Sequence, residues 1–259
     1  MNNIDKIKQK NSLGKRSFYL LPNILTTASL FAGFYSIVQA MNGAYDHAAL
    51  AIFIALILDG LDGRVARLTD TQSSFGAEYD SLSDMVSFGV APGLIVYVWA
   101  LQPLGKLGWI AAFIYCTCAA FRLARFNVKL DIDNKQFFFG LPSPAAAALI
   151  ASFIWISYDN GISGNEIFLG FFQMQWFAFL LTIFAALSMV TDLRYYSGKD
   201  INLRNSQPFI AILFIVIIFG LISHNPAEII FIILMAYALS GYVVFFRNRY
   251  IRNMRKKDA

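Results

Sequence analysis

Hydrophobic residues occur along the chain in long runs that are separated by short polar segments. A helix needs about 20 mostly apolar residues to cross the hydrocarbon core of a bilayer, and eight runs approach that length. They cover residues 19–41, 46–66, 85–102, 108–126, 143–159, 167–190, 207–223 and 226–246. This pattern predicts an all-α protein, a polytopic transmembrane helix bundle of about eight spans.

The composition agrees with that prediction. Of the 259 residues, 58% are hydrophobic and only 14% are charged, which lies outside the range of ordinary soluble domains. A basic amphipathic leader, residues 1–18, precedes the first run, and no small-residue cleavage site clearly follows the run. We therefore expect the first run to be a retained span and not a signal peptide.

Positive charges are distributed unevenly between the polar segments. All of the 21 lysines and arginines except Lys106 fall in residues 1–18, 64–84, 122–142, 191–206 and 247–259. Because cytoplasmic loops retain Lys and Arg, these segments and both termini are predicted to face the cytoplasm. This bias explains the net charge of +5. No nucleic-acid partner is expected, and the basic tails should contact anionic lipid head groups.

Four aspartates, Asp59, Asp62, Asp80 and Asp84, lie beside apolar runs, where a carboxylate is costly to bury. Residues three or four positions apart share a face of a helix, so two aspartate pairs on two helices joined near residues 68–75 can converge. Converging carboxylates repel in a low dielectric unless a cation lies between them. Oxygen ligands without nearby His or Cys favour hard divalent ions, Mg²⁺ or Mn²⁺. Solvated loop carboxylates are the less favoured interpretation.

Small residues line the helix face beside Asp62. Gly60, Gly63 and Ala66 recur every three residues, which leaves room for a bulky ligand to approach the backbone. Arg67 follows one turn after Gly63, and its planar guanidinium suits phosphate. Small residues at this spacing are also typical of helix packing in membranes, and for Gly60 alone that alternative stays open.

The motif Asp59-x2-Asp62-Gly63-x2-Ala66-Arg67-x8-Gly76-x3-Asp80-x3-Asp84 resembles, at every fixed position, the signature of the CDP-alcohol phosphotransferases. The wider chain resembles one branch of that family, the integral-membrane phosphatidylserine synthases of bacteria and archaea. The stretches that carry this second resemblance are LPNILTTASLFAGF (21–34), FRLARFNV (121–128), GLPSPAAA (140–147) and RYYSGKD (194–200).

The resemblance implies a six-helix family core at residues 19–200, two additional helices at 201–246 and a basic cytoplasmic tail at 247–259. It also implies an integral protein of a prokaryotic inner or plasma membrane, with the active site on the cytoplasmic side. Relatives of this kind often dimerise, and the sequence leaves open whether this protein is a homodimer.

The implied reaction transfers the phosphatidyl group of CDP-diacylglycerol to the hydroxyl of L-serine, giving phosphatidylserine and CMP. Asp59, Asp62 and Asp80 would hold divalent metal, Mg²⁺ or Mn²⁺, as two ions. Asp84 would act as the general base, because a serine hydroxyl is a weak nucleophile at neutral pH, and could also contact the second ion.

Two further groups of residues are expected to bind substrate. Residues expected to hold the nucleotide or diphosphate are Asn23, Thr26, Gly63, Ala66, Arg67 and Gly76. For the first two, with Pro22, an ordinary helix start is the alternative. Residues expected to bind the serine carboxylate or lipid phosphate are Arg122, Arg125, Asn127 and Lys199, and interfacial anchoring is the alternative for the arginines.

Two alternative functions follow from the same residues. Within the enzyme class, the acceptor could be glycerol 3-phosphate, inositol phosphate or choline in place of serine. A divalent-cation transporter is the alternative of another class, because intramembrane carboxylates also line ion pathways. It is disfavoured because the acidic residues gather at one depth and the last four predicted spans carry almost no ionisable residue.

Overall fold

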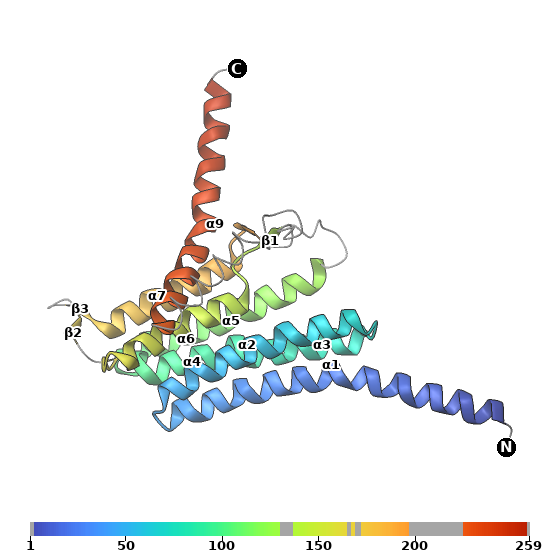
Figure 1. The fold of residues 1–259 in the computed structure, drawn as a ribbon. Helices are drawn as coiled ribbons and strands as arrows, with labels where there is room; N and C mark the ends of the chain where they lie inside the picture. The colour runs from blue at the N-terminus through green and yellow to red at the C-terminus, as the bar shows by residue number, and fades with distance from the viewer. Residues whose placement is uncertain (1–2, 130–136, 165–166, 169–171, 197–224, 258–259) are drawn as a thin grey trace, which may run out of the picture.

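The computed structural model describes residues 3–129, 137–164, 167–168, 172–196 and 225–257. Helices α1 to α7 lie along one another as an elongated bundle, and α9 leaves the bundle at a steep angle (Figure 1). The helices are α1 (Asn3–Met41), α2 (Tyr45–Leu68), α3 (Ser74–Asp84), α4 (Ala91–Val96), α5 (Lys106–Lys129), α6 (Ser143–Asp159), α7 (Met174–Val190) and α9 (Pro226–Lys257).

The third predicted span, 85–102, is part of a longer helical stretch that starts at Ser74. Here α3 continues through the π-helical segment η1 (Met85–Val90), α4, the π-helical segment η2 (Tyr97–Leu101) and the 3₁₀ turn η3 (Gln102–Leu104). Asp80 and Asp84 therefore lie inside a helix, as their four-residue spacing predicted.

Helix α1 begins at Asn3 and runs without a break through Pro22. The predicted leader is thus continuous with the first span, and the interpretation of Pro22 as the first turn of a helix is wrong. At the other end of the chain, α9 continues to Lys257. The predicted tail is therefore largely helical, which is compatible with the high helix propensity of Lys and Arg.

The membrane character of the bundle is clear from its described helices. Four helical stretches are long and apolar enough to cross a membrane: Leu21–Met41, Ser74–Leu104, Lys106–Val128 and Pro226–Arg247. Helix α7 is apolar but shorter, and α2 has the length of a span but carries two of the clustered aspartates. The all-α membrane bundle is confirmed, whereas the count of eight spans is not, and the predicted span 207–223 lies outside the described residues.

Two short antiparallel pairs of strands accompany the helices. Strand β1 (Phe137–Phe139) pairs with β4 (Arg194–Tyr196), and β2 (Ile167–Phe168) pairs with β3 (Phe172–Gln173). The sixth predicted span is consequently wrong before Met174. The β2 and β3 strands carry aromatic and β-branched residues, which favour extended backbone.

Serine side chains fix α1 against its neighbours. Ser36 donates to the Ala48 carbonyl at 2.6 Å, and Ser29 donates to the Ala55 carbonyl at 3.0 Å, both on α2. Ser87 of η1 donates in turn to the Ser29 carbonyl at 3.1 Å. A Cβ on Gly33 would lie 2.4 Å from Ser87 Oγ, so glycine is required for this close approach. These contacts align α2 and the α3–η1 stretch along α1.

Candidate active site

Three carboxylates converge between α2 and α3. Asp59, Asp62 and Asp80 each offer one carboxylate oxygen, and these oxygens lie within 4.8 Å of one another. The first two are one helical turn apart on α2, and the third comes from the helix that follows. No ion pair joins any of the three to a cation within the described part of the chain. The group has the spacing needed to hold a metal ion.

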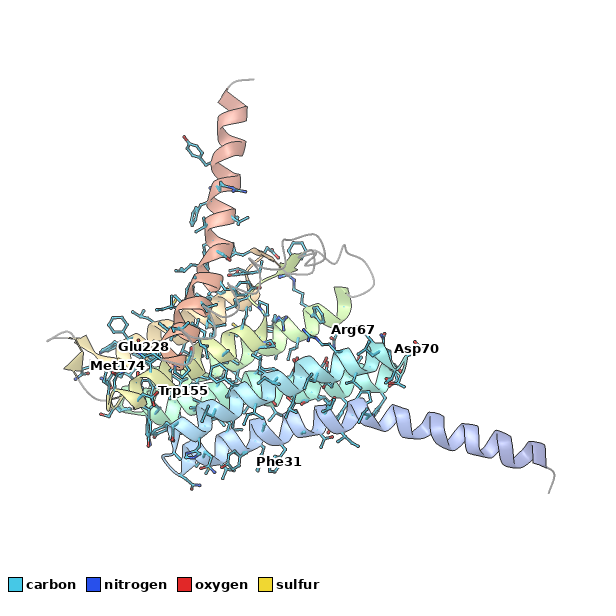
Figure 2. All side chains as sticks on the ribbon, in the orientation of Figure 1. Phe31, Arg67, Asp70, Trp155, Met174 and Glu228 are labelled. Carbon is cyan, nitrogen blue, oxygen red and sulfur yellow. The ribbon has the colours of Figure 1, made fainter. Side chains whose placement is uncertain are left out.

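A tight turn between α2 and α3 makes this convergence possible. The Thr71 amide donates to the Ala66 carbonyl at 3.0 Å, and Asp70 adopts a φ of 52°. Arg67 and Asp70 lie together at this end of the bundle (Figure 2). Ser73 caps α3 by accepting from the Gly76 amide at 3.0 Å, a role for which a serine just before a helix is a recognisable signal.

A threonine of α1 orients one of the carboxylates. Thr26 Oγ1 donates to Asp62 Oδ2 at 2.6 Å. Asp62 is only 4% exposed, so the hydrogen bond lies in a water-poor environment and restricts the carboxylate to few orientations. The structure thereby brings Thr26, predicted as a nucleotide-binding residue, into direct contact with a candidate metal ligand.

Asp80 and Asp84 each have an unsatisfied oxygen. Their Oδ1 atoms are buried and have no hydrogen-bond partner among the described residues. An unpaired buried carboxylate oxygen is strongly unfavourable, so it is found where a cation or a reacting group completes the site. An all-oxygen donor set with orphaned oxygens fits a hard divalent cation.

Arg122 links this carboxylate group to α6. Its guanidinium interacts electrostatically with Asp84 and Asp59, and Nη1 donates to Ser143 Oγ at 2.6 Å. Ser143 lies in the first turn of α6 and is fully buried. Arg122 thus interacts with the carboxylate group, and its role in substrate binding stays a prediction. Ser143 carries no signal in the sequence that would predict the contact with Arg122.

The other residues predicted to bind serine or lipid phosphate are held elsewhere. Arg125 pairs with Asp192 and donates to the Val190 carbonyl at 3.3 Å, at the end of α7. Asn127 Nδ2 donates to Ser81 Oγ of α3 at 2.9 Å. Lys199 lies outside the described residues. Arg125 and Asn127 thus have separate partners, and their contact with substrate stays a prediction.

The glycine face of α2 is open beside Asp62. A Cβ on Gly60 would meet no described atom within 4 Å, and one on Gly63 would lie 3.8 Å from Arg67 Nη1. On α3, a Cβ on Gly76 would lie 3.6 Å from Asn23 Oδ1 of α1. The described chain therefore does not use Gly60 for helix packing. Of the residues predicted to bind nucleotide, Thr26 contacts the carboxylate group directly, and Asn23 and Gly76 lie close to each other, while nucleotide binding stays a prediction.

These features define a helical membrane protein with a partly buried group of carboxylates between its first three helices that could hold a metal ion. The profile of the family described as CDP-alcohol phosphatidyltransferase matches residues 19–184. The chain belongs to that family.

Several similar proteins carry the name of a specific enzyme. A CDP-diacylglycerol–serine O-phosphatidyltransferase of Helicobacter pylori is 36% identical over 245 residues, covering 92% of this chain and 97% of the relative. A protein of the same name from Mycobacterium leprae is 30% identical, covering 84% of this chain and 72% of the relative. An archaetidylserine synthase of Methanothermobacter thermautotrophicus is 36% identical and covers 57% of this chain and 63% of the relative.

Proposed function

We propose that the protein transfers the phosphatidyl group of CDP-diacylglycerol to the hydroxyl of L-serine, forming phosphatidylserine and releasing CMP. Family membership supports the reaction class, and the names of the relatives support serine as the acceptor. The single observation in the structure that carries the proposal is the carboxylate group with buried, unpartnered oxygens on Asp80 and Asp84.

Asp59, Asp62 and Asp80 would hold two divalent ions, Mg²⁺ or Mn²⁺. Such ions would neutralise the negative charge of the diphosphate and of the departing CMP. Asn23, Thr26, Gly63, Ala66, Arg67 and Gly76 would bind the nucleotide and diphosphate. Among Arg122, Arg125, Asn127 and Lys199, proposed for the serine carboxylate or lipid phosphate, Arg122 has the most direct support, because it interacts with Asp84 and Asp59.

Asp84 would act as the general base. Its carboxylate takes the proton of the serine hydroxyl as the serine oxygen attacks the β-phosphorus, and the bond from that phosphorus to the CMP oxygen breaks. This is a single displacement, so a chirally labelled β-phosphorus should be inverted. Retention of configuration, or exchange of labelled CMP into CDP-diacylglycerol without serine, would indicate a phosphatidyl-enzyme intermediate and contradict this role.

The acceptor is tested with purified protein, CDP-diacylglycerol and Mn²⁺. Labelled serine, glycerol 3-phosphate, inositol phosphate and choline are supplied separately, and CMP release and labelled lipid are measured. We expect both products with serine alone, and Asp80→Asn serves as the inactive control. Product with another acceptor and none with serine would show that serine is not the acceptor. CMP release that no acceptor increases, without any labelled lipid, would show hydrolysis of CDP-diacylglycerol in place of transfer.

The site is proposed to face the cytoplasm of a prokaryotic cell, with both termini inside, as the distribution of Lys and Arg favours. An impermeant thiol reagent added to intact cells should label Asn42→Cys or Asn160→Cys. These residues lie in the turns after α1 and α6, whereas Gln72 lies in the α2–α3 turn. Strong labelling of Gln72→Cys would show that the orientation in the membrane is the opposite of the proposed one.

Two proposals concern organisation: a six-helix core at 19–200 followed by two further helices, and a homodimer. Analytical ultracentrifugation in detergent tests the second proposal, and a monomer at all protein concentrations would contradict it.

A further inference from the structure

The helical stretch that carries Asp84 changes its winding directly after this residue. From Met85 to Val90 the stretch is π-helical, and the Ala91 amide accordingly donates to the Val86 carbonyl, five residues back. A π-helical turn holds one residue more than the α-helical turn that it replaces, so the parts before and after it are offset by about 100° of helix rotation. Such turns are rare and often lie at functional sites. Here the turn, η1, determines which way α3 presents the proposed base.

A proline explains why an α-helix is unfavourable at this point. In an α-helix the Phe88 carbonyl would accept from the amide four residues later, but that residue is Pro92, which has no N–H and whose ring collides with such a carbonyl. The Tyr115 hydroxyl of α5 donates to the Phe88 carbonyl at 3.1 Å. Tyr115 and Phe88 are both fully buried. A tyrosine of a neighbouring helix therefore satisfies the carbonyl that the proline deprives of its amide.

Different helices hold the two sides of η1. On the side of α3, Ser83 donates to the Thr26 carbonyl of α1 at 3.1 Å. On the side of α4, a Cβ on Gly93 would lie 3.3 Å from the Ala112 carbonyl oxygen of α5, so the two helices are in close contact there. Tyr115 lies almost one turn after Ala112 on the same face of α5. Its hydroxyl therefore holds the turn between two parts of the stretch that are each fixed.

We propose that Tyr115 is a positioning residue for the reaction: by holding the Phe88 carbonyl it keeps η1 in the π-helical form that directs Asp84 into the carboxylate site. The inference rests on the proposed function, because Asp84 is proposed to take the proton of the acceptor hydroxyl. Asp84 has helical backbone angles, and its buried Oδ1 has no hydrogen-bond partner among the described residues. The direction of that oxygen therefore depends on the helix backbone around it.

The competing interpretation is that the Tyr115 hydroxyl only satisfies a buried carbonyl and stabilises the fold. Tyr195 provides a matched control, because it is also fully buried and its hydroxyl donates to the Ala238 carbonyl of α9 at 3.0 Å. Pro92→Ala provides a second comparison. It restores an amide four residues after Phe88, so that an α-helical turn can satisfy this carbonyl without the tyrosine.

The test measures serine-dependent CMP release and thermal unfolding in detergent. Tyr115→Phe and Tyr195→Phe should both lower the unfolding temperature, because each leaves a buried carbonyl without its donor. Tyr115→Phe should also lower kcat by about tenfold or more and leave the KM of both substrates within about twofold of wild type, since a misplaced reacting group weakens transition-state stabilisation. Tyr195→Phe should leave kcat within about twofold of wild type.

The double variant Tyr115→Phe/Pro92→Ala separates positioning from stability. Its unfolding temperature should recover toward the wild-type value, whereas its kcat should stay low, because an α-helical turn changes the direction of Asp84. Should Tyr115→Phe alone fold poorly, the kcat of the double variant decides the question.

Three outcomes would overturn the proposal: an unchanged kcat in Tyr115→Phe, an equal loss of kcat in the two single tyrosine variants, or a double variant with the kcat of the wild type. Failure of the proposed function itself is distinguishable, because the wild-type protein would then release no CMP in response to serine.

Discussion

Two groups of charged side chains in this bundle are satisfied in opposite ways. Asp192 is a carboxylate whose side chain is 80% exposed, and it pairs with Arg125 at the end of α7. The carboxylates between α2 and α3 lie in a far drier environment, and Asp80 and Asp84 each keep a buried oxygen without a partner among the described residues. An exposed ion pair is complete within the chain, whereas the buried group is complete only with a ligand.

The largest expected effect comes from removing one charge of the buried group. Asp59→Asn, Asp62→Asn or Asp80→Asn should lower turnover by more than about a hundredfold, since even partners of metal ligands contribute 10- to 100-fold. Asp192→Asn makes the same chemical change outside the group. It should alter turnover by less than about twofold and the free energy of unfolding by at most about 1 kcal/mol.

Steady-state CMP release and thermal unfolding in detergent measure the two effects. Wild-type turnover in any of the three site variants at ordinary Mn²⁺ concentration would remove that residue from the proposed ligands. A large loss of turnover in Asp192→Asn would show that burial does not distinguish the carboxylates needed for activity from those that only stabilise the fold.

The two arginines of α5 provide the next comparison. Arg122→Lys should lower kcat/KM by about tenfold or more, because lysine lacks the planar fork that donates to Ser143 while it interacts electrostatically with Asp84. Arg125→Lys should lower kcat/KM less than Arg122→Lys does, because a lysine can still pair with Asp192 and keeps a positive charge at the same place. Equal losses in the two variants, measured with serine and CDP-diacylglycerol varied separately, would show that substrate binding depends on Arg125 as much as on Arg122.

A smaller effect on activity is expected from substitution of Thr26, which contacts the carboxylate group but is not one of the proposed metal ligands. Thr26→Val removes the hydrogen bond to Asp62 and should raise the Mn²⁺ concentration for half-maximal activity by about tenfold. Thr26→Ser keeps the donor and should stay near the wild-type value. A valine variant with an unchanged Mn²⁺ requirement would show that the threonine only packs against α2.

Local pattern in the sequence was sufficient for the position of most described helices and for the convergence of the aspartates. Helix α6 begins and ends at the predicted residues, 143 and 159, because Pro142 and Pro144 mark its start and polar residues follow its end. The three- and four-residue spacings between the aspartates imply shared faces in any helix.

Contacts between distant segments left no such signal. The Tyr195 hydroxyl donates to the Ala238 carbonyl, 43 positions later in the sequence, and the apolar residues around Ala238 are those of any membrane helix. The same is true of the β1–β4 pairing and of the serines that fix α1, since each depends on which helices become neighbours. The third predicted span nevertheless starts at residue 85, eleven residues after the helical stretch begins at Ser74, because the polar, amphipathic turns of α3 lack the apolar run by which spans are recognised.

The most direct measurement is Mn²⁺ binding to purified protein, followed by electron paramagnetic resonance in the wild type, Asp62→Asn and Asp192→Asn. The account predicts saturable binding of up to two ions in the wild type and in Asp192→Asn, and loss of at least one of them in Asp62→Asn. Identical Mn²⁺ isotherms in all three proteins would contradict the claim that the buried carboxylates between α2 and α3 form the metal site.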